Sequence, residues 1–200
     1  MSAGKSSDVV LRRRLVALAG HHADEPAARQ GLTDSAGDVR AAALGALQRM
    51  ARLRPDDVAT ALGDPSAVVR RRACEVSVGL AVGGVTAALS DSDPLVVEAA
   101  CYALGEGGPD SGAVVVAAIV GVASEHSDPL CREAAIAALG SIGDEAGLPA
   151  ILGGLQDKPA VRRRAVIALA PFEGPEVDAA LELARSDRDW QVRQAAEDLS

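Results

Sequence analysis

Aromatic residues are nearly absent from this sequence. Its 200 residues include one Tyr, one Phe and one Trp, which together make up 2% of the chain. Large aromatic side chains dominate burial in most globular cores, so small aliphatic side chains have to fill this interior. Hydrophobic residues still account for 48% of the chain. An interior of Ala, Val and Leu favours closely packed helices, because Ala has the highest helix propensity.

Histidine and cysteine are also scarce, with three residues of each. No CxxC pair indicates a metal site or a redox motif. A metal site needs several His or carboxylate ligands at helical spacing, and the one adjacent Glu–His pair, Glu125–His126, is expected in a loop. A nucleophilic Cys needs a nearby His, and Cys74 and Cys101 have none at a matching place. We therefore expect no catalytic residues, no metal ligands and no cofactor, and we expect the cysteines to serve as small apolar fillers.

The chain has no excess of positive charge and no long apolar run. It carries 20 Lys and Arg against 28 Asp and Glu, a net charge of −8. Binding to a phosphate backbone draws on clustered Lys and Arg, so the charge balance argues against nucleic acid as a partner. The longest apolar run, residues 113–123, is well short of the ~20 residues of a membrane span, and the N-terminal segment does not resemble a signal peptide. We expect a soluble cytoplasmic protein that does not bind membranes.

The sequence does contain a repeated segment. The stretch SDPLCREAAIAALG at residues 127–140 recurs in five variant copies. Aligned on the residue before the usual Arg, which we call position zero, the copies are separated by 30, 27, 35, 30 and 31 residues. A period of this size is typical of a solenoid, in which each unit buries its apolar face against its neighbours. The residues at position zero are Val39, Val69, Val96, Cys131, Val161 and Val192.

Each repeat unit is predicted to form two helices, which we call A and B. Asp-Pro pairs indicate the start of helix B, because the carboxylate caps free N–H groups and Pro suits the first turn. These pairs are at residues 64–65, 93–94 and 128–129. Apolar or small residues at positions 0, 4, 7 and 8 form one stripe, and Gly105 and Gly140 are expected to end the helix. The A helices are expected at residues 55–62, 83–89, 111–123, 146–155 and 175–184.

These patterns predict an all-α, right-handed solenoid of about six helical pairs in a single domain, residues 1–200. Residues 1–31 are expected to form N-terminal capping helices and residues 32–200 to form the repeats. The repeated pattern resembles the HEAT repeat, in the short subtype named for the phycobilisome lyases. The matching residues are Asp128, Pro129, Arg132, Ala135, Ala138, Leu139 and Gly140. The resemblance is specific for fold but not for function, since HEAT proteins include scaffolds, bilin lyase subunits, a di-iron hydroxylase and DNA glycosylases.

An arginine follows position zero in five of the six copies, and we call this series the arginine ladder. These residues could bind a ligand, but an Asp one turn earlier favours a structural role in which Arg–Asp hydrogen bonds tie neighbouring repeats. Val97 interrupts the series, so that junction is expected to be looser or packed differently. The predicted members of the ladder are Arg40, Arg70, Arg132, Arg162 and Arg193, with Asp64, Asp93 and Asp128.

The candidate binding surface is the side of helix B opposite the core stripe. Positions 2 and 6 lie about 200° and 240° around the helix from position zero, and they should line the concave face, the usual binding surface of solenoids. Tyr102 is the aromatic residue in these columns; it could anchor a partner or fill space between neighbouring B helices. The predicted partner-binding residues are Arg71, Glu75, Glu98, Tyr102, Glu133, Arg163 and Ile167.

These observations favour a non-catalytic scaffold that binds an unidentified protein partner through its concave face, as a monomer or in a hetero-complex. The alternative is a subunit of a bilin-lyase-like enzyme or a chaperone-type assembly factor, although no residues for such a reaction are evident. Nucleic acid binding is less favoured. The Arg triplets at 12–14, 70–72 and 162–164 do not form patches, because successive helical residues point in different directions.

Overall fold

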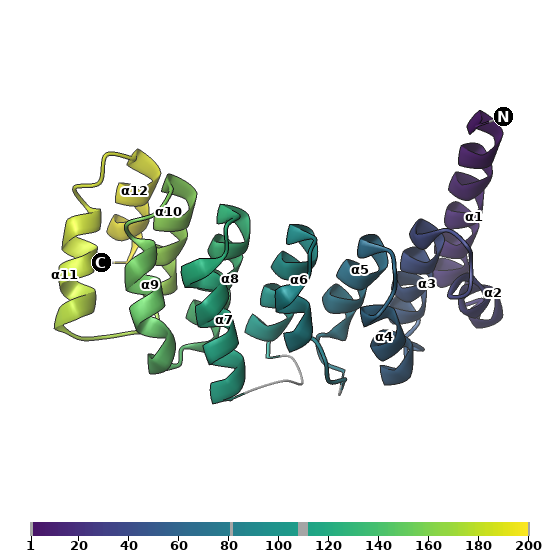
Figure 1. The fold of residues 1–200 in the computed structure, drawn as a ribbon, viewed down its shortest axis with the longest axis horizontal. Coiled ribbons are helices and arrows are strands. Elements are labelled where there is room, and N and C mark those ends of the chain that lie inside the picture. The colour runs from purple at the N-terminus through teal and green to yellow at the C-terminus, as the bar shows by residue number, and fades with distance from the viewer. Residues whose placement is uncertain (1, 81, 108–111, 200) are drawn as a thin grey trace.

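The computed structural model describes residues 2–80, 82–107 and 112–199, and all the regular structure in these ranges is helical (Figure 1). Twelve α-helices and two 3-10 helices follow one another along the described chain. They are α1 (Ser2–His22), α2 (Glu25–Gly31), α3 (Gly37–Arg49), α4 (Pro55–Leu62), α5 (Ala67–Ser77), η1 (Thr86–Ser90), α6 (Pro94–Gly105), α7 (Ala113–Glu125), α8 (Pro129–Ile142), η2 (Glu145–Gly147), α9 (Leu148–Gly154), α10 (Pro159–Ala168), α11 (Pro175–Ala184) and α12 (Trp190–Asp198).

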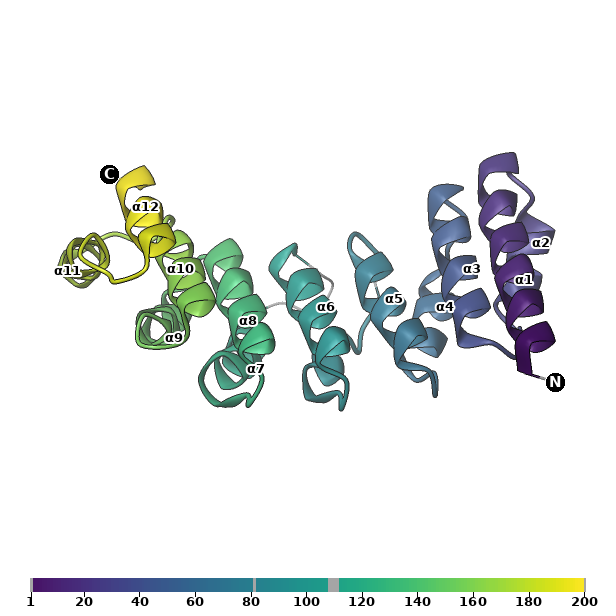
Figure 2. The same cartoon turned by 90° about the horizontal axis from the view of Figure 1, so that it is seen from above.

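The helices form an α-solenoid, as the repeat predicts. The B helices are α3, α5, α6, α8, α10 and α12, and each packs against the next along the array. The A elements are α2, α4, η1, α7, α9 and α11. In Figure 2 the B helices lie along the inner side of a shallow arc, with α7, α9 and α11 on the outer side. The B helices therefore supply the concave face. None of the described helices is long and apolar enough to cross a membrane.

The expected helix starts are found in two of the three Asp-Pro pairs. Asp93 and Asp128 each accept a hydrogen bond from the backbone N–H two residues on, at 3.0 and 2.9 Å, at the starts of α6 and α8. The prediction for Asp64 is wrong, because α5 begins three residues later, at Ala67. The Asp64 carboxylate instead accepts from the Ser66 N–H, at 2.8 Å, which stabilises a turn before the helix.

Two glycines in the B helices permit close helix packing. Gly140 was expected to end its helix, but α8 continues to Ile142 and ends at Gly143, where φ is +68°. A Cβ atom on Gly140 would lie 2.7 Å from the Cα of Ala168 in α10. In the same way, a Cβ on Gly105 would lie 2.9 Å from the Cα of Ala138 in α8. These contacts bring neighbouring B helices together without large side chains between them.

The expected A helices are found at four of the five places, and the third unit is the exception. There a short 3-10 helix, η1, replaces the helix expected at residues 83–89. Gly84 has a φ of +98°, which lies outside the helical region and delays the start of regular structure to Thr86. The interior nevertheless remains continuous, because a single apolar cluster runs from Cys74 in α5 to Ala180 in α11.

Small side chains fill this interior, as the composition predicts. The largest fully buried side chains are Leu, Ile and Val. Phe172 is also buried, whereas Tyr102 and Trp190 are more than half exposed. The three cysteines are free and fully buried in consecutive B helices, α5, α6 and α8. Burial raises the pKa of Cys74 and Cys101 to about 12. Thiols with such pKa values are poor nucleophiles, which fits a packing role.

Helix α1 has the features of a B helix. It packs against α3 as the other B helices pack against one another. Arg12 donates to both carboxylate oxygens of Asp34, at 2.9 and 3.1 Å, as a ladder arginine would. A Cβ on Gly20 would lie 2.8 Å from the Cα of Ala46, which matches the glycine contacts farther along the array. The regular packing therefore extends into residues that were expected to form a cap.

The outward face of α1 is apolar. Leu11, Leu15 and Leu18 occupy positions 0, 4 and 7, which are buried in later repeats, yet each of these leucines is at least 42% exposed. A capping element needs a polar outer surface, and these three side chains do not provide one. The boundary at residue 31 between cap and repeats stays a prediction.

Candidate functional site

The ladder arginines join consecutive repeats through the loops that precede the B helices. Arg162 shows the pattern: its Nε and Nη2 donate to Asp187 at 2.8 and 2.7 Å, and its Nη1 donates to the carbonyl of Asp157 at 2.9 Å. One guanidinium therefore links two successive loops with three hydrogen bonds. Two-pronged bonds to a carboxylate are strong and directional. The bidentate pairs are Arg12–Asp34, Arg40–Asp64, Arg70–Asp91, Arg132–Asp157 and Arg162–Asp187.

The carboxylates of the ladder differ from those expected. Asp64 is a partner, but Asp93 and Asp128 are not, because their carboxylates accept from N–H groups of their own helices. The partner of Arg70 is Asp91, two residues before the capping Asp93. At the end of the array, Arg193 donates to the backbone carbonyl of Asp187 at 2.8 Å. The ladder therefore depends on a loop Asp that lies before the helix cap.

The ladder carboxylates titrate below their ordinary range. Hydrogen bonds from the guanidinium groups are the main cause of the lowered pKa of Asp34, Asp64, Asp91, Asp157 and Asp187. Burial opposes this effect, because desolvation disfavours the charged carboxylate. The same pairs raise the pKa of their arginines. Both partners therefore remain charged, so the ladder arginines are held by carboxylates at the repeat junctions.

Both members of the ladder are replaced at the junction between α6 and α8. Val97 stands where the arginine would be and is fully buried, while His126 stands in the loop where the partner aspartate would be. The His126 Nδ1 accepts from the Asp128 N–H at 3.1 Å, which is the turn bond that an Asp makes in the other loops. The thiol of Cys131 donates to the Pro94 carbonyl at 3.5 Å across this junction. The expected difference in packing is therefore an apolar contact in place of an ion pair.

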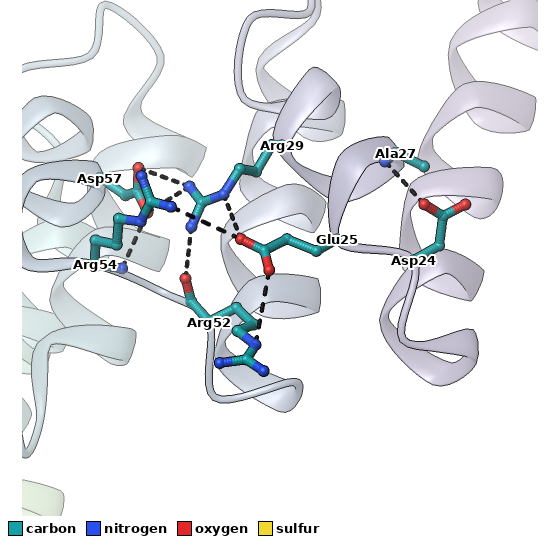
Figure 3. A network of polar contacts seen from close by, with 7 residues as sticks. All are labelled: Asp24, Glu25, Ala27, Arg29, Arg52, Arg54 and Asp57. Carbon is teal, nitrogen blue, oxygen red and sulfur yellow. Dashed lines mark hydrogen bonds and ion pairs between the residues drawn. The ribbon is translucent and has the colours of Figure 1, made fainter.

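A second polar network ties the first A helices together, and Figure 3 shows it from close by. Arg29 donates to Glu25 at 2.7 Å, to Asp57 at 3.1 Å and to the Arg52 carbonyl at 2.8 Å. Arg52 and Arg54 approach the Glu25 carboxylate at 3.7 and 3.9 Å. Arg29 lies on α2 and donates both to the loop after α3 and to α4. This network therefore stabilises the junction of the first two repeats.

The predicted concave-face residues fall into three groups along the array. On α5, Arg71 and Arg72 both pair with Glu75, at 2.9 and 2.8 Å, so two guanidinium groups share one carboxylate there. On α6 and α8, Glu98, Tyr102 and Glu133 line a common pocket. On α10, Arg163 is partly exposed and Ile167 is exposed. The structure therefore brings three of the seven predicted residues together.

The pocket between α6 and α8 has a volume of about 370 Å³. The angular positions on helix B did not predict three residues that shape this pocket, Glu106, Leu130 and Arg164. Arg164 reaches from α10 to the Glu133 carboxylate at 3.5 Å. Its Nε is buried and has no hydrogen-bond partner among the described residues. The pocket is lined by Glu98, Tyr102, Gly105, Glu106, Leu130, Glu133, Ala134, Ala137, Ala138, Ser141 and Arg164.

A row of exposed apolar side chains crosses the same face. Val68, Leu95 and Leu130 stand one residue before position zero in α5, α6 and α8, and all three are exposed. That position lies about 260° around the helix, next to the predicted column at 240°. Helical periodicity could therefore have identified it. Together with Tyr102 and Ile167, these residues form a set of exposed apolar side chains on the B helices, which we call the apolar row.

The described residues do not supply a group of three or more His, Cys, Asp or Glu side chains placed to hold a metal ion. His21 and His22 are exposed at the end of α1, far along the array from His126. None of these three histidines lines the pocket between α6 and α8. The pocket thus offers carboxylates, one guanidinium, an aromatic ring and apolar walls, which are groups suited to binding.

Solved structures with a similar arrangement of helices include human deoxyhypusine hydroxylase in complex with glycerol. It is 21% identical, with a TM-score of 0.50, and the match covers 95% of this chain and 78% of that one. A designed armadillo repeat protein in complex with the peptide (KR)4 is 15% identical, with a TM-score of 0.50, covering 94% of this chain and 84% of that one. At these identities the likenesses show the fold alone.

No curated protein matches the sequence. The family model for HEAT repeats matches residues 82–170 and 116–199. Together these matches cover residues 82–199, more than half of the chain, and they include the units that carry the pocket and most of the apolar row. The chain therefore belongs to the HEAT-repeat family.

Proposed function

We propose that the protein is a non-catalytic scaffold that binds a protein partner through the concave face of its B helices. The observation that carries this proposal is the placement of exposed large hydrophobic residues. Outside α1, five of the eight such side chains among the described residues belong to the apolar row, and the other three are Val114, Leu183 and Trp190. Large apolar side chains that are exposed on one face suit an interaction site.

The polar residues of this face suit a protein partner of mixed charge. Glu98, Glu106 and Glu133 lie in mid-array, and Arg71 and Arg163 lie on either side. A uniformly basic stripe, which phosphate binding requires, is not what these residues form. Aromatic and Arg side chains often dominate the energetics of interfaces, so we expect Tyr102 and Arg163 to contribute most.

The absence of catalysis is also a proposal. Human deoxyhypusine hydroxylase, an enzyme, has a similar fold, and that likeness is compatible with an enzymatic alternative. A scaffold is favoured because burial raises the pKa of the thiols and the pocket lacks histidine. The finer family assignment, to the phycobilisome-lyase subtype, rests on the match of residues 128–140 and stays a proposal as well.

Site-specific photo-crosslinking tests the binding face. A photoreactive phenylalanine analogue would replace Tyr102 on the concave face or the exposed Val114 on α7, in an extract of cells that make the protein. We expect a discrete crosslinked protein from position 102, its loss when Ile167→Glu is added, and no such product from position 114. A product from position 114 that survives Ile167→Glu would place binding on the outer face and contradict the proposal.

A further inference from the structure

The pocket between α6 and α8 carries uncompensated negative charge. Glu133 approaches Arg164, and Glu75 on the neighbouring α5 is paired with two arginines. Glu98 and Glu106, by contrast, have neither an ion pair nor a side-chain hydrogen bond among the described residues. Three carboxylates therefore face one guanidinium across a space of about 370 Å³. A cation is the complementary ligand for this arrangement.

The walls of the pocket suit a cation at the end of an apolar stem. Tyr102 is 56% exposed, so its ring is available to a ligand, and a cation over an aromatic ring is attracted by the ring's electron density. Leu130 and Ala137 form an apolar wall beside it. Lys and Arg bury their aliphatic stems along apolar surface while the charged group remains near polar atoms. Both parts of such a side chain would find matching groups here.

Arg164 is the one guanidinium of the pocket. Its side chain is 35% exposed and its Nη2 lies 3.5 Å from the Glu133 carboxylate, so it balances one of the three carboxylates in part. Its Nε is buried, and a ligand in the open pocket does not reach that atom. Glu98 and Glu106 are therefore the carboxylates left to a cationic side chain.

The apolar row extends the site beyond the pocket. Leu95 and Leu130 stand on the two helices that form the pocket, and Val68 continues the row on α5. In an extended peptide, side chains two residues apart point to the same side. A basic residue in the pocket would therefore turn the residues two positions away toward the same face, on which Leu95 and Val68 are exposed.

We propose that this pocket binds a lysine or arginine side chain of an extended peptide segment, with apolar residues two positions on either side lying on the apolar row. This inference rests on the proposed function and specifies the partner: a segment of a protein in which a basic residue alternates with apolar ones. The acidic pocket gives the affinity for the basic side chain, and the apolar row sets the spacing of its neighbours.

NMR titration of the isotope-labelled full chain tests the proposal. The probe is a synthetic peptide with the central sequence Leu-Ala-Lys-Ala-Leu, and the matched control has norleucine in place of lysine, which removes the charge and keeps the stem. We expect the lysine peptide to bind about tenfold more tightly and to shift resonances of Leu95, Tyr102 and Leu130. A glutamate version should not bind. Equal affinity for the lysine and norleucine peptides would overturn the inference.

Variants of the protein locate the interaction. Combined Glu98→Gln and Glu106→Gln should weaken binding of the lysine peptide about tenfold and leave the norleucine peptide unaffected. Tyr102→Leu keeps an apolar side chain but loses the ring, so it should weaken the lysine peptide selectively. Glu176→Gln, at an exposed carboxylate on α11, is the matched control and should change nothing. Unchanged affinity in the Gln double variant would contradict the assignment to this pocket.

The outcomes separate this inference from the proposed function. If no peptide shifts any resonance at millimolar concentration while crosslinking through position 102 persists, the basic-segment inference fails and the concave scaffold stands. If the lysine peptide instead shifts resonances of the outer A helices and crosslinking occurs from position 114, both fail. Tight binding of a small amine such as butylammonium, equal to that of the lysine peptide, would show a site for free cations and overturn the peptide assignment.

Discussion

The junctions between consecutive B helices are of two kinds. Between α8 and α10, a guanidinium bridges two loops, and Arg132 donates to both carboxylate oxygens of Asp157 at 2.6 and 2.7 Å. Between α6 and α8, the buried Val97 and the loop residue His126 replace that pair. The apolar cluster is continuous through both. The α6–α8 junction is therefore held by apolar packing and the Cys131–Pro94 hydrogen bond, without an ion pair. Elsewhere the ladder adds a fixed placement of the loops.

The junction without a ladder pair is also where the candidate pocket lies. Glu98 and Tyr102 come from α6, and Glu133 comes from α8. On α5, two guanidinium groups pair with the single carboxylate of Glu75, whereas in this pocket one guanidinium, that of Arg164, faces three carboxylates.

Removal of the most buried ladder arginine should have the largest effect. The Arg162 side chain is 6% exposed, and Arg162→Ala leaves Asp187 and the Asp157 carbonyl without their donor. We expect the free energy of unfolding to fall by about 3 kcal/mol, since breaking a buried pair strands the other charge. Urea denaturation followed by circular dichroism measures this. The neighbouring Arg163→Ala is the control and should cost little; equal losses would show that the ladder does not stabilise the fold.

Rebuilding a ladder pair at the α6–α8 junction tests whether the two kinds of junction are interchangeable. Val97→Arg alone should destabilise the chain, because it places an unpaired charge at a buried position. With His126→Asp added, the new pair should recover about 2 kcal/mol of unfolding free energy as a coupling term in a double-mutant cycle. Additive effects of the two substitutions would mean that this junction has a geometry in which the pair cannot form.

The glycine contacts should be important at both kinds of junction. Gly105→Ala and Gly140→Ala each place a Cβ within 3.0 Å of a neighbouring Cα, and overpacking of this kind costs about 1–3 kcal/mol. Gly153→Ala in α9 is the control, because nothing lies within 4 Å of its Cβ position. It should raise stability by up to about 1 kcal/mol through helix propensity. Melting temperatures compare the three variants, and destabilisation by Gly153→Ala would remove the packing explanation.

Acid should weaken the ladder junctions gradually. The lowered pKa of Asp64, Asp91, Asp157 and Asp187 means that the unfolded chain binds protons more readily than the folded one. Their contribution is fully present above the ordinary pKa of Asp, about 3.9, and is lost as the pH falls through the lower folded values. Urea unfolding from pH 6 to pH 3 measures this. Asp91→Asn should reduce the slope, and an unchanged slope would show that the pairing does not stabilise the fold.

Periodicity made the fold predictable, and it made part of the site predictable. The Asp-Pro starts of α6 and α8, and the bounds of α4 and α11, follow from local rules for capping and for Pro. The sequence does not identify Asp91 and Asp157 as ladder partners, because the contact joins different repeats. Beside Asp91, the capping Asp93 of α6 is also the more conspicuous carboxylate. The repeat predicts a helix end at Gly140, because the close contact of Gly140 with Ala168 cannot be read from the residues of one repeat.

The same reason explains what was missed in the pocket. Glu98, Tyr102 and Glu133 are predicted from their angular positions on a single helix. Arg164 reaches the pocket from the next repeat, and Glu106 lies at the end of α6, outside the columns considered. Contacts between repeats depend on the rise and tilt from one unit to the next, which the residues of one unit do not specify.

The three buried cysteines can report on the local opening of individual B helices. Cys74, Cys101 and Cys131 lie in successive B helices, so they mark one ladder junction and the junction without a ladder pair. Each thiol can react with a disulfide reagent only while its own helix is transiently exposed, so the reaction rate measures the free energy of that opening. In a solenoid, such openings are set by nearest-neighbour interfaces. The order in which the thiols react would therefore rank the interfaces of the unmodified chain.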